Sequence, residues 1–293
     1  VRLNVWTVKD REQSDNLISC TWVFCRKYNA EGTEIEKKAR LCAHGFLQRE
    51  GVDYDSTFAL TGRLNSLRVL ISEAASKGWQ FHQLDVRSAF LNAPLEENIT
   101  LKIPPGVEQP ESKVLKLNKA IYGLKQAPRA WYKHISSYLN NINFKISKAD
   151  PCIFYRSEKP PIWINLHVDD LAVFGEDIHE FKNQIKMKFK MKDSGPAEHL
   201  LGMKITQHKD FITLTQESYT NSILSTYKIK ENEKSNTPLE PNIKLEKATE
   251  EDITIFKNLN ENYRKLIGSL NYLSTATRPD ITYAVSALSQ FLR

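Results

Sequence analysis

The segment IWINLHVDDLAVFG, residues 162–175, alternates apolar and polar side chains over its first eight positions. A two-residue period of this kind predicts a half-buried β-strand. Two adjacent carboxylates, Asp169 and Asp170, then interrupt the apolar run, which resumes over residues 171–174. The segment therefore predicts a hairpin with two anions at its centre, although burying an unpaired charge is costly.

Apolar residues recur at helical spacing in several other segments. The first predicts a helix over residues 64–77 that ends before Gly78. A second helix is predicted from about Ala130, after a loop, and a third over residues 176–192. The apolar side of the third is expected to carry Phe181, Ile185, Met187 and Phe189. The remaining helices are predicted at residues 218–227 and on either side of Arg278-Pro279.

Strands are predicted between these helices. The N-terminal part suggests short strands around a turn at residues 29–32, and residues 79–90, WQFHQLDVRSAF, suggest a strand that carries Asp85. Two more strands are expected around a polar turn in residues 199–216. Residues 228–250, rich in Lys, Glu, Asn and Pro, are the best linker candidate. Because strands and helices mix without strict alternation, the pattern predicts an α+β fold.

Composition adds little to this picture. The 293 residues are 41% hydrophobic and carry a net charge of +6, which suits a polyanionic partner without requiring one. No apolar run approaches the length of a bilayer span, and the N-terminus lacks a signal-peptide stretch, so we expect a soluble intracellular chain without a membrane partner. The cysteines and histidines match no zinc spacing. We also expect the chain to be part of a longer protein.

Three carboxylates lie on segments that otherwise resemble buried strands: Asp85, Asp169 and Asp170. Like charges in close proximity raise a pKa or require a cation. Carboxylate oxygens are preferred ligands of Mg²⁺, and two such ions can stabilise the attacking and leaving oxygens in phosphoryl transfer. The alternative is structural, because a buried Asp pair can also cap turns or form salt bridges with Arg or Lys.

Two other acidic motifs are weaker. Asp193-Ser194-Gly195 has the letters of an aspartic protease triplet, but its neighbours suggest a polar loop rather than an apolar strand. Asp53 and Asp55 lie in a segment rich in Gly and Ser, where we expect a loop. Neither motif is taken as a catalytic site.

Six blocks of the sequence follow one another nearly from end to end of the chain: KARLCAHGFLQREGVDYDSTFA, QLDVRSAFLNAPLEE, LNKAIYGLKQAPRAWY, LHVDDLAVFG, HLLGMKI and YRKLIGSLNYLSTATRPDITYAVSALSQF. Together they resemble the reverse transcriptase of copia-type long-terminal-repeat retrotransposons. They occur in that family's order and at its spacing.

The resemblance implies a right-hand polymerase with fingers, a palm built on an antiparallel sheet, and a helical thumb. Residues 1–78 and 96–130 would form the fingers, and residues 79–95 the palm strand with the first catalytic Asp. Residues 131–215 would supply the palm hairpin and primer grip. Residues 216–293 would form the thumb and connection, with the linker near residues 228–250.

The same resemblance implies roles for individual residues. Asp85, Asp169 and Asp170 would be catalytic and, with Val86, would hold two Mg²⁺ ions, Mn²⁺ being an alternative. The resemblance places two further groups: the nucleotide would contact Lys38, Arg40, Phe90, Gln126 and Pro128, and the primer and template would contact His167, Leu201, Gly202 and Met203. The Phe90 ring would exclude a sugar 2′-hydroxyl, and Gly202 would let backbone approach backbone.

The implied partners are an RNA template, a DNA primer and dNTPs, with integrase and ribonuclease H regions elsewhere in the same Pol polyprotein. The implied location is a cytoplasmic virus-like particle with nuclear entry. The sequence departs from the family at several positions, including His167 where Tyr is usual and Leu60 where Pro is usual. Two alternatives therefore stay open: a catalytically decayed remnant that only binds nucleic acid, and a scaffold within the polyprotein.

Overall fold

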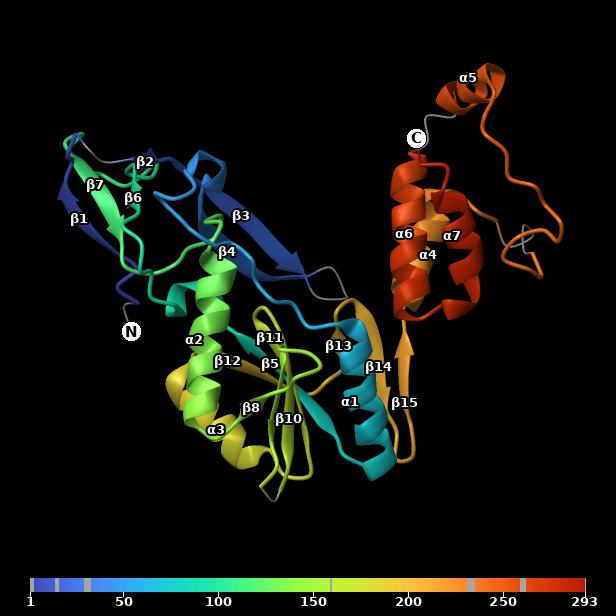
Figure 1. Ribbon diagram of the computed structural model, residues 1–293, viewed down its shortest axis with the longest axis horizontal. Coiled ribbons are helices and arrows are strands. Elements are labelled where there is room, and N and C mark those ends of the chain that lie inside the picture. Colours follow the sequence, from blue (N-terminus) through green and yellow to red (C-terminus); the bar gives the residue numbers. More distant parts are fainter. Residues whose placement is uncertain are drawn as a thin grey trace. The chain divides into compact units, whose positions relative to one another are not determined.

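The computed structural model describes residues 3–13, 16–28, 33–158, 160–230, 235–258 and 262–292 (Figure 1). The chain divides into two compact units, Val1–Pro196 and Ala197–Arg293. Both contain helices and antiparallel strands, so the α+β prediction is confirmed. The turn predicted at residues 29–32 lies outside the described residues.

A six-stranded sheet forms the centre of the first unit, in the order β12-β5-β11-β10-β9-β8. The strands are β5 (Phe81–Val86), β8 (Lys145–Ile146), β9 (Ile153–Arg156), β10 (Ile162–His167), β11 (Asp170–Gly175) and β12 (Met191–Pro196). All neighbouring pairs are antiparallel, and β5 lies between β11 and β12. The apolar run of β11 therefore lies inside a sheet, where its side chains are buried on both faces.

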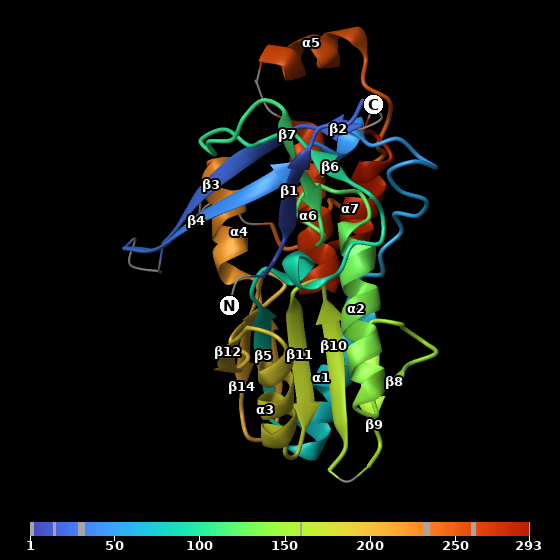
Figure 2. The same ribbon diagram turned by 90° about the vertical axis from the view of Figure 1, so that its left-hand side faces the viewer.

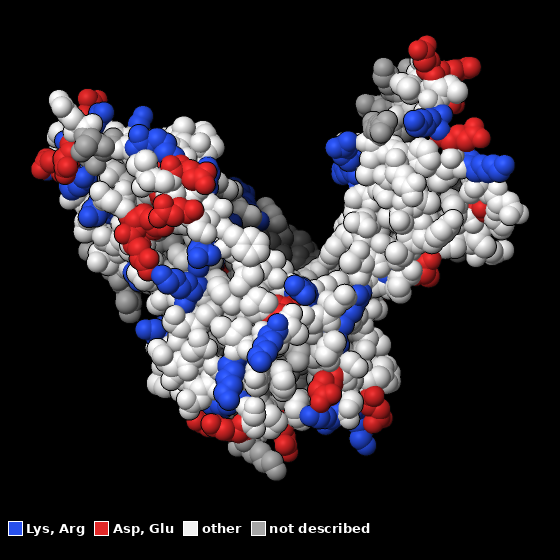
Figure 3. Space-filling view, in the orientation of Figure 1, with Lys and Arg blue, Asp and Glu red and all other residues white. Residues whose placement is uncertain are grey.

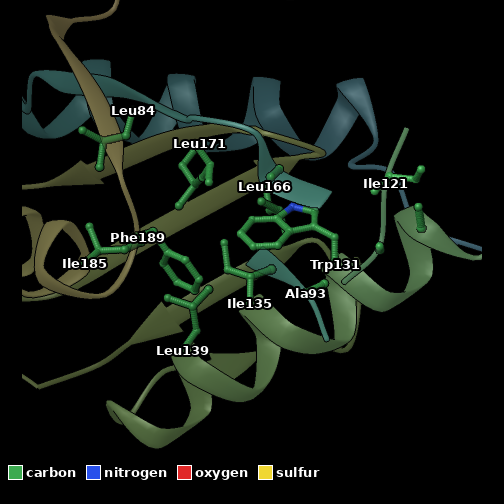
Figure 4. Close-up of a cluster of buried hydrophobic side chains, with 14 of the residues drawn as sticks. Leu84, Ala93, Ile121, Trp131, Ile135, Leu139, Leu166, Leu171, Ile185 and Phe189 are labelled. Atoms are coloured by element: carbon green, nitrogen blue, oxygen red, sulfur yellow. The ribbon is translucent and has the colours of Figure 1, made fainter. Parts of the chain in front are cut away.

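Two helices, α2 (Ala127–Asn141) and α3 (His179–Lys188), cover one face of this sheet (Figure 2). Their buried side chains meet those of the strands in a continuous hydrophobic core. Figure 4 shows part of it, with Leu84, Leu166 and Leu171 from the strands facing Trp131, Ile135, Leu139, Ile185 and Phe189. This packing fixes which face of β5 and β11 is buried against the helices, and alternate residues point to the opposite face.

Helix α1 (Leu64–Lys77) has the predicted bounds, and it buries Leu67, Leu70, Ile71 and Ala74 on one face. Gly78 ends it in the left-handed region at φ 65°, a conformation that glycine adopts at little cost. At its beginning the Arg63 N–H donates to Asp150 Oδ2 at 2.9 Å. Burial alone raises the pKa of Asp150, but hydrogen bonds from Ser66 and from backbone N–H groups outweigh burial and lower it. A distant carboxylate thus caps this helix.

The rest of the first unit contains a smaller sheet and a long hairpin. The sheet has the order β1-β7-β6-β2 and consists of β1 (Trp6–Asp10), β2 (Leu17–Ile18), β6 (Thr100–Leu101) and β7 (Lys113–Leu117). The hairpin pairs β3 (Cys20–Tyr28) with β4 (Glu34–Ala43). A short 3₁₀ turn, η1 (Gly45–Leu47), follows β4, and another, η2 (Ala89–Asn92), follows β5. Strand β4 carries Lys38 and Arg40, so its placement decides where these cations lie.

The end of β4 is fixed by a close approach of two backbone segments. The Ala43 N–H donates to the Tyr122 carbonyl at 2.8 Å. A Cβ at Gly123, which has φ +88°, would overlap the Ala43 carbonyl oxygen, and a Cβ at Gly45 would overlap the Gly123 carbonyl oxygen. Glycine is therefore required at both positions for this contact.

Replacing Gly123 by alanine is expected to lower the free energy of unfolding by about 2 kcal/mol or more, because backbone atoms cannot move aside as a flexible side chain can. Gly268 in helix α6 (Tyr263–Ala276) provides the control, since a Cβ there meets no atom within 4 Å. Gly268→Ala should raise the free energy of unfolding by about 0.5–1 kcal/mol. Chemical denaturation measures both, and a neutral Gly123→Ala would contradict the close approach.

The second unit joins a small sheet to a set of helices. The sheet has the order β13-β14-β15, formed by β13 (His199–Leu200), β14 (Met203–Gln207) and β15 (Ile212–Thr215). The helices are α4 (Glu217–Thr226), α5 (Glu250–Asn258), α6 and α7 (Thr282–Ser289), with the 3₁₀ turn η3 (Pro279–Ile281). The predicted break at Arg278-Pro279 is confirmed. The described part of the predicted linker, residues 228–250, contains no helix or strand except at Glu250, which begins α5.

Three local predictions are wrong. Helix α2 begins at Ala127 rather than near Ala130, because Pro128 fits the first turn of a helix. Helix α3 spans His179–Lys188, so Met187 is 83% exposed instead of lying on the buried side. Asp193-Ser194-Gly195 belongs to strand β12 rather than to a loop, because β12 pairs with β5.

Charge is distributed without strong segregation on the face shown in Figure 3, where Lys and Arg side chains are interspersed with Asp and Glu. Within the described residues, none of the helices combines the length and the apolar character that crossing a bilayer requires.

Candidate active site

Pairing between β5 and β11 brings the predicted carboxylates together from two distant segments. Asp85 and Asp170 are direct partners in the antiparallel register, which places their side chains on the same face of the sheet. The backbone of Asp169 is held as well, because the Val86 N–H donates to its carbonyl at 2.8 Å. The carboxylates therefore meet where β5 ends and the β10–β11 turn begins.

The turn between β10 and β11 has a strained backbone that a side chain from α2 holds in place. His167 pairs with Asp170, so Val168 and Asp169 form a two-residue turn. Val168 has φ +57°, a conformation unfavourable for a β-branched residue. The Trp131 indole N–H donates to the Val168 carbonyl at 2.6 Å, and Trp131 is buried in the core beside the sheet. Strained backbone of this kind persists only where surrounding contacts hold it.

Trp131→Phe removes this donor, and it is expected to lower the free energy of unfolding by about 2 kcal/mol through the unpaired carbonyl and the lost volume. Amide exchange at Val86, whose N–H bonds the neighbouring turn residue, should accelerate. Trp22→Phe deletes the same kind of bond at an exposed position, to the Pro105 carbonyl at 3.1 Å, and should change both measurements little. Equal effects of the two substitutions would contradict a special restraint at the turn.

The environment of Asp170 disfavours an uncompensated negative charge. Burial is the main cause that raises its pKa, and the charges of Asp169 and Asp85 raise it further. A hydrogen bond of 3.1 Å from Gln83 Nε2 to Asp170 Oδ1 partly opposes them. Three carboxylates under these conditions favour a bound cation.

A cavity of about 1020 Å³ opens beside these carboxylates, lined by residues of β4, β5 and the segment from α3 to β12. Asp85, Val86 and Asp169 lie on its wall. Its basic lining consists of Lys37, Lys38, Arg40, Arg87, Lys186, Lys188, Lys190 and Lys192. Anionic groups and cations together on its wall suit a ligand that carries phosphates together with a metal ion.

The predicted nucleotide contacts are divided between two places. Lys38 and Arg40 line the cavity, whereas Phe90 lies next to it with its ring edge-on to Tyr122, at 4.8 Å between centroids. Gln126 is buried in a network in which its Nε2 donates to the Asp53 carbonyl at 2.9 Å. Its Oε1 accepts from Gln48 at 2.9 Å.

Gln126 lines a different cavity, of about 400 Å³, and Pro128 lies in the first turn of α2. Their contact with nucleotide stays a prediction.

The predicted primer contacts lie in both units. His167 is the last residue of β10, and its Nδ1 is buried without a hydrogen-bond partner among the described residues. Leu201, Gly202 and Met203 belong to the second unit, where Leu201 and Gly202 form the turn between β13 and β14. A Cβ at Gly202 would overlap the hydroxyl of Tyr272. The absence of a side chain at Gly202 therefore makes room for the Tyr272 side chain, whereas the prediction from the sequence was a close approach of another backbone segment.

Two residues of the site were missed in the sequence, Trp131 and Tyr122. Trp131 reads as an ordinary core residue of an amphipathic helix, and its bond to the turn spans 37 residues. Tyr122 lines the same cavity as Arg40, Asp85 and Asp169. Both belong to the block LNKAIYGLKQAPRAWY, so the block itself was the available signal.

The carboxylates of this site suit a Mg²⁺ ion that is bound partly by water and substrate, rather than a metal ion enclosed entirely by protein ligands. Across the described residues, no group of three or more His, Cys, Asp or Glu side chains is preformed around a metal position. Mg²⁺ needs only one or two carboxylates when water and substrate phosphates complete its shell. Asp85 and Asp169 at the cavity wall, with Asp170 beside Asp85, provide such a set.

Comparison with known proteins identifies the family. Residues 3–241 match the family described as reverse transcriptase (RNA-dependent DNA polymerase). The Pol polyprotein from transposon TNT 1-94 of Nicotiana tabacum is 38% identical, over 94% of this chain and 22% of that protein. The Pol polyprotein from transposon RE1 of Arabidopsis thaliana is 35% identical, over 94% of this chain and 19% of that protein.

A putative transposon Ty5-1 protein of Saccharomyces cerevisiae is 34% identical, over 72% of this chain and 69% of that protein. Among solved structures, a foamy viral protease-reverse transcriptase in complex with double-stranded DNA covers 97% of this chain and 45% of its own, with 13% identity and a TM-score of 0.37. This chain spans about a fifth of the length of the two plant polyproteins. The predicted family is confirmed: the chain belongs to the reverse transcriptases, and its relatives are Pol polyproteins of copia-type transposons.

Proposed function

We propose that this chain adds dNTPs to the 3′-hydroxyl of a primer on an RNA or DNA template, by phosphoryl transfer supported by two Mg²⁺ ions. The observation that carries the proposal is the antiparallel pairing of Asp85 with Asp170, with Asp169 adjacent, beside a cavity that is lined by Asp85, Asp169 and a set of Lys and Arg side chains. Bound Mg²⁺ would neutralise charge on the reacting phosphate and activate the attacking hydroxyl.

The protein's own residues then have positioning roles. Asp85, Asp169 and Asp170, with the backbone of Val86, would hold the ions at the end of β5. Arg40 and Lys38 lie on the cavity wall formed by β4 and bind the triphosphate, where the guanidinium offers paired donors to phosphate oxygens. Phe90 limits the space at the sugar 2′ position. Such positioning supplies much of the catalysis in phosphoryl transfer.

The remaining roles follow from the family. The six-stranded sheet is the palm, the N-terminal strands are fingers, and the C-terminal helices form the thumb. Leu201, Gly202, Met203 and His167 contact the primer, and Gln126 and Pro128 shape the nucleotide pocket. Integrase and ribonuclease H regions of a Pol polyprotein are the neighbouring partners, and a cytoplasmic virus-like particle with nuclear entry is the location.

Primer extension on an RNA template, with Mg²⁺ and all four dNTPs, tests the proposal directly. Activity that requires the divalent ion and a matched template supports it. Salt-dependent binding of primer–template without extension supports instead a remnant that only binds nucleic acid. Absence of both binding and extension favours a scaffold role.

A further inference from the structure

Tyr122 contacts Phe90 and Arg40, and it lines the same cavity as the carboxylates Asp85 and Asp169. The proposed function gives each of these groups a different role. Its ring meets the Phe90 ring edge-on, with centroids 4.8 Å apart and planes at 65°. The Arg40 guanidinium carbon lies 5.3 Å from the centre of the same ring. Tyr122 also lines the cavity that holds Asp85 and Asp169 on its wall.

The backbone of Tyr122 is fixed to the strand that carries Arg40. Cys42 of β4 forms an isolated parallel bridge with Tyr122, and the Ala43 N–H donates to the Tyr122 carbonyl at 2.8 Å. The close approach at Gly123 leaves this junction little freedom. A displacement of β4 would therefore move the Tyr122 ring as well.

The polar end of the Tyr122 side chain remains a neutral phenol. Burial is the main cause that raises its pKa, and the charge of Asp169 raises it further, whereas Arg40, which also hydrogen-bonds to it, opposes the rise. A neutral hydroxyl beside Arg40 forms no ion pair with the guanidinium that would compete with phosphate.

The geometry points to Tyr122 as a positioning residue that sets the Phe90 ring and the Arg40 guanidinium in one fixed relation. The nucleotide's sugar is selected by Phe90 while its triphosphate is bound by Arg40, so both contacts depend on the same aromatic ring. This inference rests on the proposed function and extends it: discrimination between dNTP and rNTP is coupled to triphosphate binding through Tyr122.

Two substitutions in the full chain separate the functions of the ring and the hydroxyl. Tyr122→Leu removes the edge contact with Phe90 and the cation–π contact with Arg40. It should lower the dNTP-to-rNTP ratio of kcat/KM by about tenfold and raise the KM for dNTP by a similar factor. Tyr122→Phe keeps the ring, so it should keep the selectivity ratio and raise the KM for dNTP only about threefold.

Tyr132→Phe is the matched control, because it removes a hydroxyl that donates to the Pro151 carbonyl at 2.8 Å. It should leave the selectivity ratio unchanged. An active wild-type chain whose selectivity ratio is the same in Tyr122→Leu overturns this inference and leaves the proposed function standing. A wild-type chain that binds primer–template but never extends it overturns both.

Discussion

Replacing Asp85 by asparagine is expected to reduce primer extension by about three orders of magnitude or more, since a lost metal ligand removes several kcal/mol of transition-state stabilisation. Asp169→Asn should act similarly, because Asp169 lies on the same cavity wall. The substitutions keep side-chain size, so the loss can be assigned to charge and to metal binding. Initial rates on an RNA template, measured over a range of Mg²⁺ concentrations, provide the readout.

Stability and binding distinguish this loss from misfolding. The charge of Asp85 is one of the causes that raise the pKa of Asp170. Removing that charge relieves repulsion, so Asp85→Asn should melt at the same or a higher temperature than the wild type in the absence of metal. Salt-dependent affinity for primer–template should persist. The exposed Asp177 is a matched control, and Asp177→Asn should extend primers normally. Undiminished extension by Asp85→Asn would refute the metal assignment.

Much of this site could be predicted because its signals are local. Carboxylates within apolar strands are rare, so Asp85, Asp169 and Asp170 stand out in the sequence. The pattern alone also allowed a structural role, and the resemblance to the family was needed to predict a catalytic one. Helix α1 was predicted with correct bounds because helical spacing and Gly78 agree. Such agreement between pattern and capping signal leaves few alternatives for the chain.

The missed features depend on contacts between distant segments. Tyr122 and Trp131 gain their roles from β4 and from the β10–β11 turn, which no local pattern reveals. Strand β12 contains Gly and Pro and reads as a loop, yet it extends the sheet by pairing with β5. Its register shifts between Asp193 and Pro196, which explains how these residues are accommodated at a sheet edge.

Asp193 in this edge strand is held by a cluster of cations and has no protease-like surroundings. Lys182 Nζ lies 2.8 Å and Lys186 Nζ lies 2.6 Å from Asp193 Oδ2. The Lys182 side chain is only 8% exposed, and its Nζ also lies 2.9 Å from His82 Nδ1. Burial alone raises the pKa of Asp193, but the hydrogen bonds from the two lysines outweigh burial and hold it far below its ordinary value. Burial and the charge of Lys182 lower the pKa of His82.

Asp193→Asn is therefore expected to lower the free energy of unfolding by about 3 kcal/mol or more, because it leaves the buried Lys182 without a counter-ion. The folded-state pKa of Asp193 is depressed, so its contribution is complete above the unfolded pKa of about 3.9 and is lost as the pH falls below that value. The wild type should lose stability steeply in this acid range. Asp193→Asn should lose less, and denaturant titrations at a series of pH values would measure the difference.

Two further variants test whether the burial of Lys182 causes the loss of stability expected in Asp193→Asn. Asp10→Asn breaks an exposed ion pair, in which Asp10 Oδ1 lies 2.9 Å from Lys113 Nζ, and should change stability little. The double substitution Lys182→Met with Asp193→Asn removes the buried cation together with its counter-ion, and it should recover most of the loss, because an apolar side chain needs no partner. A double variant as unstable as Asp193→Asn alone would contradict the burial of Lys182 as the cause, because asparagine keeps the Oδ1 atom to which the Gly195 N–H donates at 3.0 Å in the wild type.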